Sequence, residues 1–378
     1  MNDTRTYQIC NICVMDTSDM DIEFDEKGQC NHCRSALNKK TENTSYIAGK
    51  SEELLNLIVD KIKTNGRGRA YDCLVGISGG VDSCYVAYMC KKLGLKPLLL
   101  HFDNGWDAEI AVQNIKNVAK NLDVDYLSYV VNWQEFKEIQ LAFLKSSTVD
   151  LEYPTDIGIF ASLSEVAKKH KINYIISGGN SSSEGILPLS WGYHVKRDLK
   201  YYKEIVKNFS KVPLKAVPVE SILGEVYNKF VKNIKTIYIL NYLNYDKEQA
   251  KKILQEELGW QEYGGKHHES KITAFWQSYV MPVKYNMDYR KATFSSQICS
   301  GQLSRVEALK MLENSLPYNP STVESDKQYI AKKFEISIDD FNKCLSQPPK
   351  TYKDFKNNKK VIDFVMNTYR AIFTKGRI

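Results

Sequence analysis

The sequence lacks long hydrophobic runs. None of its 378 residues belongs to a stretch of about 18 apolar residues, the length a helix needs to span a bilayer. No basic segment followed by an apolar run opens the chain, so we expect neither a secretion signal nor a membrane span. At 43% hydrophobic and 26% charged residues, the composition is that of a soluble globular protein, which we expect in the cytoplasm.

Two common phosphate-binding motifs are also missing. Without Gly-x-x-x-x-Gly-Lys-Ser/Thr, no loop lysine is placed to stabilise a transferred γ-phosphate. No Gly-x-Gly-x-x-Gly follows a candidate strand, which disfavours a dinucleotide site. The net charge of 52 − 45 = +7 suits an anionic small substrate, although solubility alone explains it equally well. It is small for a nucleic-acid partner, and we expect none.

Apolar runs alternate with amphipathic segments after residue 50. We predict strands over Asp72–Ile77, Pro97–Phe102, Asp125–Val131 and Asn173–Ser177, separated by helices over Ser83–Leu93, Asp107–Asn121, Trp133–Leu144 and Ile157–His170. Strands separated by helices of this length predict an α/β fold with a parallel doubly wound sheet. We place a cysteine module in 1–45, a nucleotide domain in 46–220 and a mostly helical substrate or partner region in 221–378.

The clearest motif lies between the first strand and its helix, and it consists of Ser78, Gly79, Gly80, Val81, Asp82 and Ser83. A helix start offers unpaired N–H groups, and glycines let an anion approach the backbone closely. This combination predicts a cradle for the pyrophosphate of ATP. Asp82 would repel phosphate, so we expect it to hold Mg²⁺ and to be catalytic. A Gly-Gly turn with a capped helix is the simpler alternative.

Two further polar segments end predicted strands. They comprise Phe102, Asp103 and Asn104 after the second strand, and Ser177, Gly178, Gly179 and Asn180 after the fourth. Ligands bind at the carboxyl edge of open sheets, so we predict that these residues contact ATP. Both segments could also be ordinary turns.

Nine cysteines are present, four of them in two Cys-x-x-Cys pairs: Cys10, Cys13, Cys30 and Cys33. Sixteen residues separate the pairs, a spacing typical of a zinc ribbon. Four thiolates leave no open coordination position, so we expect a structural Zn²⁺. An iron site is the weaker alternative. We interpret the other cysteines as buried apolar residues, and a catalytic role for Cys299 is not expected.

Two polar clusters follow in the C-terminal region. We predict substrate binding by Lys266, His267, His268 and Glu269, although a solvated turn is an alternative. Three basic residues, Lys284, Arg290 and Lys291, could supply positive charge to polyphosphate, and we predict a catalytic role for them. A solvated basic strip is the alternative there.

The Ser78–Ser83 loop resembles the signature of the N-type ATP pyrophosphatase (PP-loop) superfamily. In order along the chain, the cysteine module, this loop, Asp103-Asn104-Gly105-Trp106, the Gly-Gly-Lys-His-His-Glu segment and the Arg-Lys-Ala stretch resemble the N-acetyl sugar amidotransferase family of surface-polysaccharide biosynthesis. One departure is Asn286, where glycine is expected.

This resemblance implies an adenine nucleotide alpha hydrolase-like fold and a reaction that uses ATP and Mg²⁺. The acetamido group of a nucleotide-linked sugar would be adenylylated on oxygen and attacked by ammonia, which gives an acetamidino group. A separate glutaminase like that of histidine biosynthesis would supply the ammonia, together with a synthase-like barrel partner.

Two other functions stay open at this point. A tRNA-thiolating enzyme can pair the same loop with zinc modules, but it usually needs catalytic cysteines near the nucleotide. A non-catalytic zinc-ribbon nucleic-acid-binding protein would not need the loop.

Overall fold

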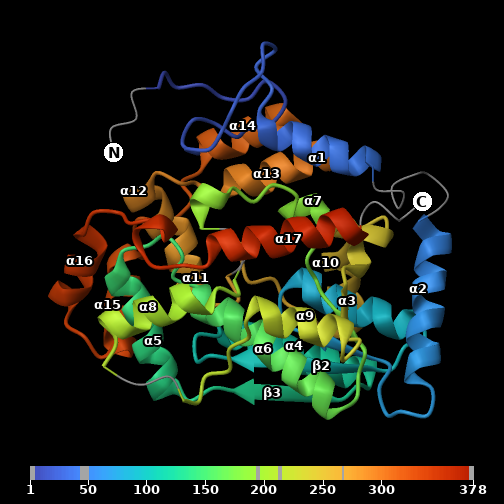
Figure 1. Ribbon diagram of the computed structural model, residues 1–378. Helices are drawn as coiled ribbons and strands as arrows, with labels where there is room; N and C mark the ends of the chain where they lie inside the picture. Colours follow the sequence, from blue (N-terminus) through green and yellow to red (C-terminus); the bar gives the residue numbers. More distant parts are fainter. Residues whose placement is uncertain (1–4, 43–50, 193–195, 212–214, 266–267, 374–378) are drawn as a thin grey trace.

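A parallel five-stranded sheet forms the base of the molecule (Figure 1). The computed structural model describes residues 5–42, 51–192, 196–211, 215–265 and 268–373. The strand order is β3-β2-β1-β4-β5, and every pairing is parallel. The strands are β1 Cys73–Gly76, β2 Pro97–Asp103, β3 Tyr126–Val130, β4 Tyr174–Ile176 and β5 Lys235–Ile237. The predicted α/β fold with a parallel sheet is therefore confirmed.

The helices of the nucleotide domain follow the predicted alternation. They are α2 Ser51–Gly66, α3 Val81–Lys92, α4 Glu109–Leu122, α5 Trp133–Ser146, α6 Tyr153–Lys169 and α7 Ser181–Glu184. Each predicted helix of this domain appears, with ends shifted by a few residues. A short 3-10 turn, Leu189–Trp191, ends this part of the chain.

The inner strands β1, β2 and β4 are buried on both faces, which explains their nearly continuous apolar sequences. Cys73 and Val75 of β1 pack into a cluster with α3 and α4. Leu74 points the other way and packs with Val166 of α6. Successive strand residues point to opposite faces, so two separate cores cover the sheet.

The sheet extends beyond the domain boundary that we predicted at residue 220. β5 pairs with β4 through Tyr174–Lys235 and Ile176–Ile237. Helix α10, Lys247–Leu258, packs against α3. Both elements belong to the nucleotide domain in space, whereas the boundary itself stays a prediction.

Helix α8, Leu199–Phe209, follows and still falls within the range 46–220 predicted for the nucleotide domain. The remaining helices form the mostly helical C-terminal region that we predicted. They are α9 Ile222–Phe230, α11 Lys271–Phe275, α12 Met281–Tyr285, α13 Tyr289–Ser300, α14 Arg305–Asn314, α15 Val323–Phe334, α16 Ile338–Ser346 and α17 Lys359–Phe373. A π-helical turn, Trp276–Val280, joins α11 to α12, and 3-10 turns occupy Ile239–Tyr242 and Tyr352–Asp354. Apolar residues of α8, α11, α12, α13, α15 and α16 share the largest core with the cysteine module.

The cysteine module, which ends in α1 Asn31–Glu42, lies at the top of Figure 1 over α13 and α14. Its thiols are buried against the C-terminal helices rather than exposed. The module is therefore packed onto the body of the molecule.

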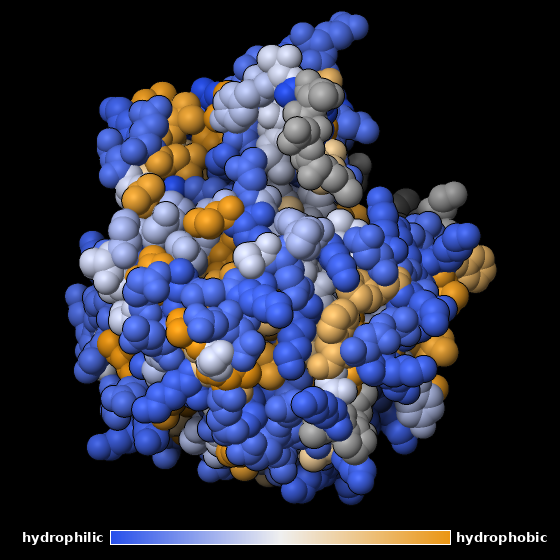
Figure 2. All heavy atoms as spheres, turned by 90° about the vertical axis from the view of Figure 1, so that its left-hand side faces the viewer, coloured by the Kyte–Doolittle hydropathy of each residue, from blue (hydrophilic) through white to orange (hydrophobic). Residues whose placement is uncertain are grey.

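The face shown in Figure 2 is mostly hydrophilic, and its apolar residues form separate small patches. Within the ranges that the structure describes, every helix is too short or too polar to cross a membrane.

Candidate functional site

A small cavity of about 150 Å³ opens beside the predicted phosphate loop. Its described lining residues come from the loop, the β4 turn, α7, α10 and the segment before α11: Ser78, Gly80, Val81, Asp82, Ser83, Gly178, Glu184, Lys247, Tyr263 and Glu269. Segments nearly 200 residues apart in sequence thus meet at one point. Five of the six predicted loop residues line this cavity.

The sixth loop residue, Gly79, supports the loop from behind. Its φ of 84° lies in the left-handed region that glycine adopts without strain, and a Cβ there would overlap the carbonyl oxygen of Ala111 in α4. Its own carbonyl oxygen accepts a hydrogen bond from Nε1 of Trp260 at 2.9 Å. Gly79 therefore fixes the loop between α4 and the segment after α10.

The loop leaves the start of α3 open to an anion. Gly80 is the N-cap residue, and it has no side chain that could cap the helix. The Ser83 hydroxyl accepts from the Ser78 N–H at 3.1 Å and donates to the Gly80 carbonyl oxygen at 3.1 Å. These bonds hold the loop in a curved shape, and the uncapped N–H groups of α3 remain as an anion site.

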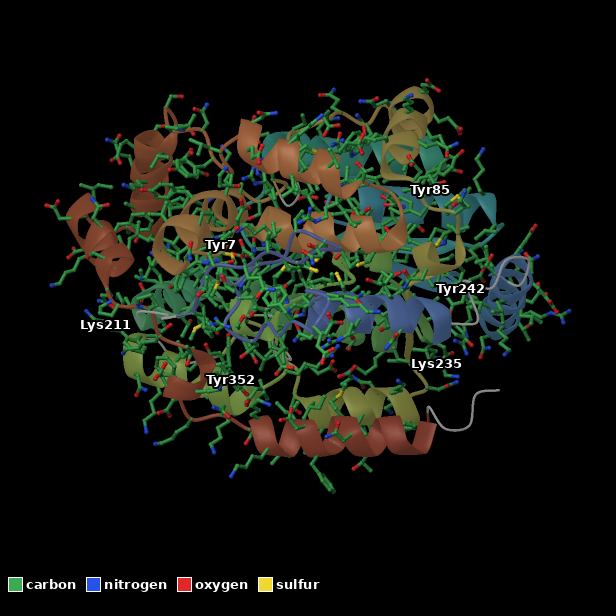
Figure 3. All side chains as sticks on the ribbon, turned by 90° about the horizontal axis from the view of Figure 1, so that it is seen from above. Tyr7, Tyr85, Lys211, Lys235, Tyr242 and Tyr352 are labelled. Carbon is green, nitrogen blue, oxygen red and sulfur yellow. The ribbon has the colours of Figure 1, made fainter. Side chains whose placement is uncertain are left out.

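The Asp82 carboxylate has a buried partner that sequence reasoning did not identify. The hydroxyl of Tyr245 donates a hydrogen bond to Oδ1 of Asp82. Burial, followed by the negative charge of Asp82, raises the pKa of Tyr245, so this hydroxyl keeps its proton. The ring of Tyr85 on α3, labelled in Figure 3, lies 5.5 Å from the Tyr245 ring and supports it.

Glu269 places a second carboxylate at the loop. Its Oε1 accepts a hydrogen bond from the Tyr263 hydroxyl at 2.7 Å and lies against Gly80, where a Cβ would overlap it. Burial raises the pKa of Glu269, and the nearby charge of Asp82 adds to the rise. The Glu269 carbonyl oxygen accepts from the Ala108 N–H at 2.7 Å, which anchors the segment beside α4.

Glu184 and Lys247 line the same cavity, and the sequence analysis missed both. Glu184 lies four residues after the predicted Ser177–Asn180 turn. This short distance in sequence is the signal that could have identified Glu184 as a site residue. Lys247 lies at the start of α10, far from any predicted motif.

The β4 turn is only partly in the cavity. Gly178 lines it, and a Cβ on this residue would meet the Ser83 N–H at 3.0 Å. Asn180 instead caps α7, accepting from Ser183 N at 2.9 Å, and the Ser177 hydroxyl accepts from Gly179 N at 3.2 Å. Their predicted contacts with ATP stay a prediction.

The residues at the end of β2, Phe102 to Asn104, lie at the same sheet edge but are not among the described residues that line the cavity. Phe102 is buried and stacks on Tyr129 at 6.1 Å. Asp103 accepts from the Gly105 N–H at 2.9 Å, and Asn104 donates to Thr155 Oγ1 at 3.1 Å. In the structure these side chains shape the turn.

The three predicted basic catalytic residues have other described partners. Lys291 forms an ion pair with Asp16 of the cysteine module. Arg290 donates to Asp288, 2.7 Å away, and to the Ser315 carbonyl oxygen at 2.9 Å. None of the three belongs to the described cavity lining, and their predicted catalytic role stays a prediction.

Lys284 donates to the Cys344 carbonyl oxygen at 3.0 Å, and burial lowers its pKa to about 8. Of the predicted substrate-binding set, Lys266 and His267 lie outside the described residues. His268 accepts from the Gly265 N–H at 3.1 Å and contacts Ser278 at 3.3 Å, and burial lowers its pKa.

The four cysteines of the N-terminal module converge as predicted. The sulfurs of Cys10, Cys13, Cys30 and Cys33 all lie within 4.8 Å of one another and are buried. Main-chain N–H groups donate to these sulfurs, for example Ile12 to Cys10 at 3.4 Å. Four buried thiols with N–H donors fit a tetrahedral metal such as Zn²⁺.

Two family models match separate parts of the chain. Residues 51–149 match NAD synthase, and residues 269–369 match the family described as LPS biosynthesis protein WbpG-like, C-terminal domain. The chain therefore joins a PP-loop domain to a WbpG-like C-terminal domain. The WbpG-like match begins at Glu269, the residue that lies against Gly80 of the loop.

A curated relative is the uncharacterized protein MJ1599 of Methanocaldococcus jannaschii, 31% identical over 120 residues. The alignment covers 31% of this chain and 41% of the relative. The chain thus spans less than half the length of the curated relative it matches.

Two solved structures show a remote likeness. The NH3-dependent NAD synthetase from Campylobacter jejuni is 18% identical, with a TM-score of 0.30 over 79% of this chain and 98% of that one. The U34-tRNA thiolase NcsA from Methanococcus maripaludis is 14% identical, with a TM-score of 0.34 over 86% and 89%. Likenesses this low do not bear on function.

Proposed function

We propose that this WbpG-like protein is an ATP-dependent amidotransferase of surface-glycan biosynthesis. Its substrate would be a nucleotide-linked sugar, whose acetamido group becomes an acetamidino group. The observation that carries the proposal is the position of Glu269, which opens the WbpG-like domain and lies in the cavity of the PP-loop. The domain matched by the polysaccharide family thus contributes directly to the ATP pocket.

The chemistry needs an activated amide, because an amide carbonyl is a poor electrophile. The acetamido oxygen would attack the α-phosphorus of ATP, forming an O–P bond as the bond to pyrophosphate breaks. Ammonia would then add to the amide carbon, and AMP would leave with the oxygen. The uncapped N–H groups of α3 would stabilise the charge that develops on pyrophosphate.

Magnesium fits the donor set of this cavity. Asp82, Glu184 and Glu269 bring three carboxylates to a space that has one described lysine, Lys247. Carboxylate oxygens are the ligands that Mg²⁺ prefers. A bound Mg²⁺ would neutralise part of the charge on the phosphates, while Tyr245 orients Asp82.

Ammonia would come from a separate glutaminase similar to that of histidine biosynthesis, with a synthase-like barrel as a further partner. In the described part of the cavity no cysteine is available as a glutaminase nucleophile. Ammonia made elsewhere must reach the adenylylated amide unprotonated, which favours a docked partner over diffusion. The four-thiol centre would hold a structural Zn²⁺.

Sulfur transfer to tRNA has less support in the geometry. Cys84 follows the loop directly, yet it is fully buried. Burial, with the nearby charge of Glu269 second, raises the pKa of the Cys84 thiol. A thiol that resists ionisation is a poor nucleophile, and we keep amidotransfer as the proposed reaction.

The deciding experiment incubates the protein with ATP, Mg²⁺, ¹⁵N-ammonium and acetamido-bearing nucleotide sugars. Mass spectrometry should show one oxygen replaced by a ¹⁵NH group, with AMP formed in equal amount. Asp82→Asn should abolish both products, whereas Asp339→Asn on the exposed surface of α16 should not. AMP formation with tRNA instead of sugars would contradict the proposal.

A further inference from the structure

One face of helix α13 packs against the cysteine module. Lys291, Ser295 and Cys299 are four residues apart in turn and therefore lie on one side of the helix. Lys291 pairs with Asp16, and the Ser295 hydroxyl accepts from the Val14 N–H at 3.2 Å. Cys299 is the third member of this row and reaches the metal centre itself.

The sulfur of Cys299 lies 3.7 Å from the sulfur of Cys33. Within the four-thiol set, Cys10 and Cys33 are 3.9 Å apart, and Cys13 and Cys30 are 3.8 Å apart. Four thiolates at about 2.3 Å from a tetrahedral Zn²⁺ have sulfur-to-sulfur edges of about 3.8 Å. Cys299 thus contacts the Cys33 sulfur at a similar distance, although it is not a member of the set of four sulfurs that all lie within 4.8 Å of one another.

The charge of a four-thiolate zinc centre points to a role for the Cys299 sulfur. Four thiolates around Zn²⁺ carry an excess of two negative charges, and the Cys33 sulfur is buried. Arg305 offsets part of that charge, donating to the Cys10 and Cys13 carbonyl oxygens at 2.9 and 3.0 Å. A neutral thiol beside Cys33 can donate S–H to the thiolate and offset a further part.

We propose that Cys299 is a fifth sulfur of the metal centre. While Cys33 holds zinc, Cys299 donates its S–H to the Cys33 sulfur. When Cys33 is lost, Cys299 gives its proton to water and takes the empty corner, so the metal stays four-coordinate. This inference rests on zinc occupancy of the module and is independent of the amidotransferase reaction.

The test measures zinc per chain by elemental mass spectrometry in full-length variants purified with zinc. Cys33→Ser should retain close to the wild-type content, because Cys299 replaces the lost ligand. Cys13→Ser is the matched control, since its described sulfur neighbour is Cys30, and it should lose most of its zinc. The double variant Cys33→Ser/Cys299→Ser should lose zinc as Cys13→Ser does.

A kinetic measurement covers the case in which Cys33→Ser does not fold. Chelator-driven zinc release from Cys299→Ala should be at least fivefold faster than from wild type, whereas Cys344→Ala in α16 should match wild type. Zinc loss from Cys33→Ser equal to that from Cys13→Ser, or unchanged release from Cys299→Ala, would overturn the proposal. A wild-type protein without zinc would instead refute the metal assignment itself.

Discussion

At the scale of single residues, the shape of the Ser78–Ser83 loop depends on glycine, which has no side chain. Gly79 combines a φ of 84° with direct contact against the Ala111 carbonyl oxygen. We expect Gly79→Ala to displace the loop, abolish AMP formation and lower the unfolding free energy by about 2 kcal/mol, from backbone strain plus overlap. AMP release and thermal denaturation would measure the two effects.

Gly68 provides the control for that change. Its φ of 77° is similar, but a Cβ there would meet nothing within 4 Å. Gly68→Ala should cost only about 1 kcal/mol and leave AMP formation intact. If Gly79→Ala and Gly68→Ala lost AMP formation equally, the geometry of the loop would not explain the loss.

Tyr245 fixes the orientation of Asp82 through a single hydroxyl. Tyr245→Phe removes that donor while the ring contact with Tyr85 remains, so the fold should be little affected. We expect a several-fold higher Mg²⁺ concentration for half-maximal AMP formation. Tyr71→Phe removes a comparable hydrogen bond to Asp125 away from the cavity and should behave as wild type. An unchanged Mg²⁺ requirement in Tyr245→Phe would argue against the role of Asp82.

Glu152 makes stability depend on pH. Burial, with the charge of Asp156 second, raises its pKa from 4.5 to about 7. Between these values the folded chain binds more protons than the unfolded chain, so the unfolding free energy falls as pH rises through that window. Glu152→Gln should therefore be more stable than wild type at pH 8, on the order of 2 kcal/mol, and not at pH 4. Urea unfolding at both pH values, with exposed Glu256→Gln as control, would show whether the gain is specific.

At the scale of elements, α13 connects the cysteine module to the rest of the chain. Asp16 is fully buried, and it pairs with Lys291 of α13 and accepts from the Tyr7 hydroxyl at 3.0 Å. Tyr7 is labelled in Figure 3, where the blue module crosses the C-terminal helices. Lys291 therefore has a structural partner that explains it without catalysis.

Removing Lys291 should leave a buried charge unpaired. We expect Lys291→Met to lower the unfolding free energy by about 3 kcal/mol and to expose the module to limited proteolysis. The double variant Asp16→Asn/Lys291→Met should recover most of that loss, because the charge is then gone. A stable Lys291→Met protein that lost only AMP formation would support the catalytic role predicted from sequence.

Comparing the predicted elements with the structure shows how much of the fold the sequence could predict. The apolar runs of β1 and β2 and the six-residue loop were sufficient for the sheet and the phosphate site, because both signals are local. β5 was missed because it is a three-residue edge strand, Lys235–Ile237, whose first two residues are exposed. A short polar edge carries no hydrophobic pattern to detect.

The partners of the site residues could not be predicted for a different reason. Tyr245 lies 163 residues from Asp82, and Lys291 lies 275 residues from Asp16. Contacts at such separations are set by how helices pack, and no local spacing encodes them. Packing also gives the basic residues of α12 and α13 partners that the sequence did not show, and their role toward phosphate stays a prediction.

At the scale of the whole molecule, α13 lies between the four-thiol cluster and the loop cavity, in contact with α1 and α7. Ser295 faces the cysteine module, whereas the adjacent Ser296 hydroxyl accepts from the Ile186 N–H at 2.9 Å. Ile186 follows the cavity residue Glu184 by two positions. Helix α13 and the short segment from Glu184 to Ile186 thus connect the two sites. Contacts of this kind can couple metal binding at one site to nucleotide binding at the other.

Coupling between two binding sites must be reciprocal. If zinc tightens ATP binding by some factor, ATP tightens zinc binding by the same factor. We expect ATP with Mg²⁺ to slow chelator-driven zinc release from the wild-type protein about fivefold, which is the lower end of usual couplings. Calorimetry should show ATP binding weakened by a similar factor in the metal-free protein.

Ser296 is the residue on which that coupling can be tested. Ser296→Ala removes the acceptor for the Ile186 N–H without touching the cysteines, so zinc content should stay at the wild-type level while the effect of ATP on zinc release disappears. Ser346→Ala, on the exposed part of α16, should keep the full effect. If ATP slows zinc release equally in Ser296→Ala and wild type, the coupling runs through another contact. If ATP has no effect on zinc release from the wild type, the two sites act independently. The cysteine module would then serve only to hold the C-terminal helices in place.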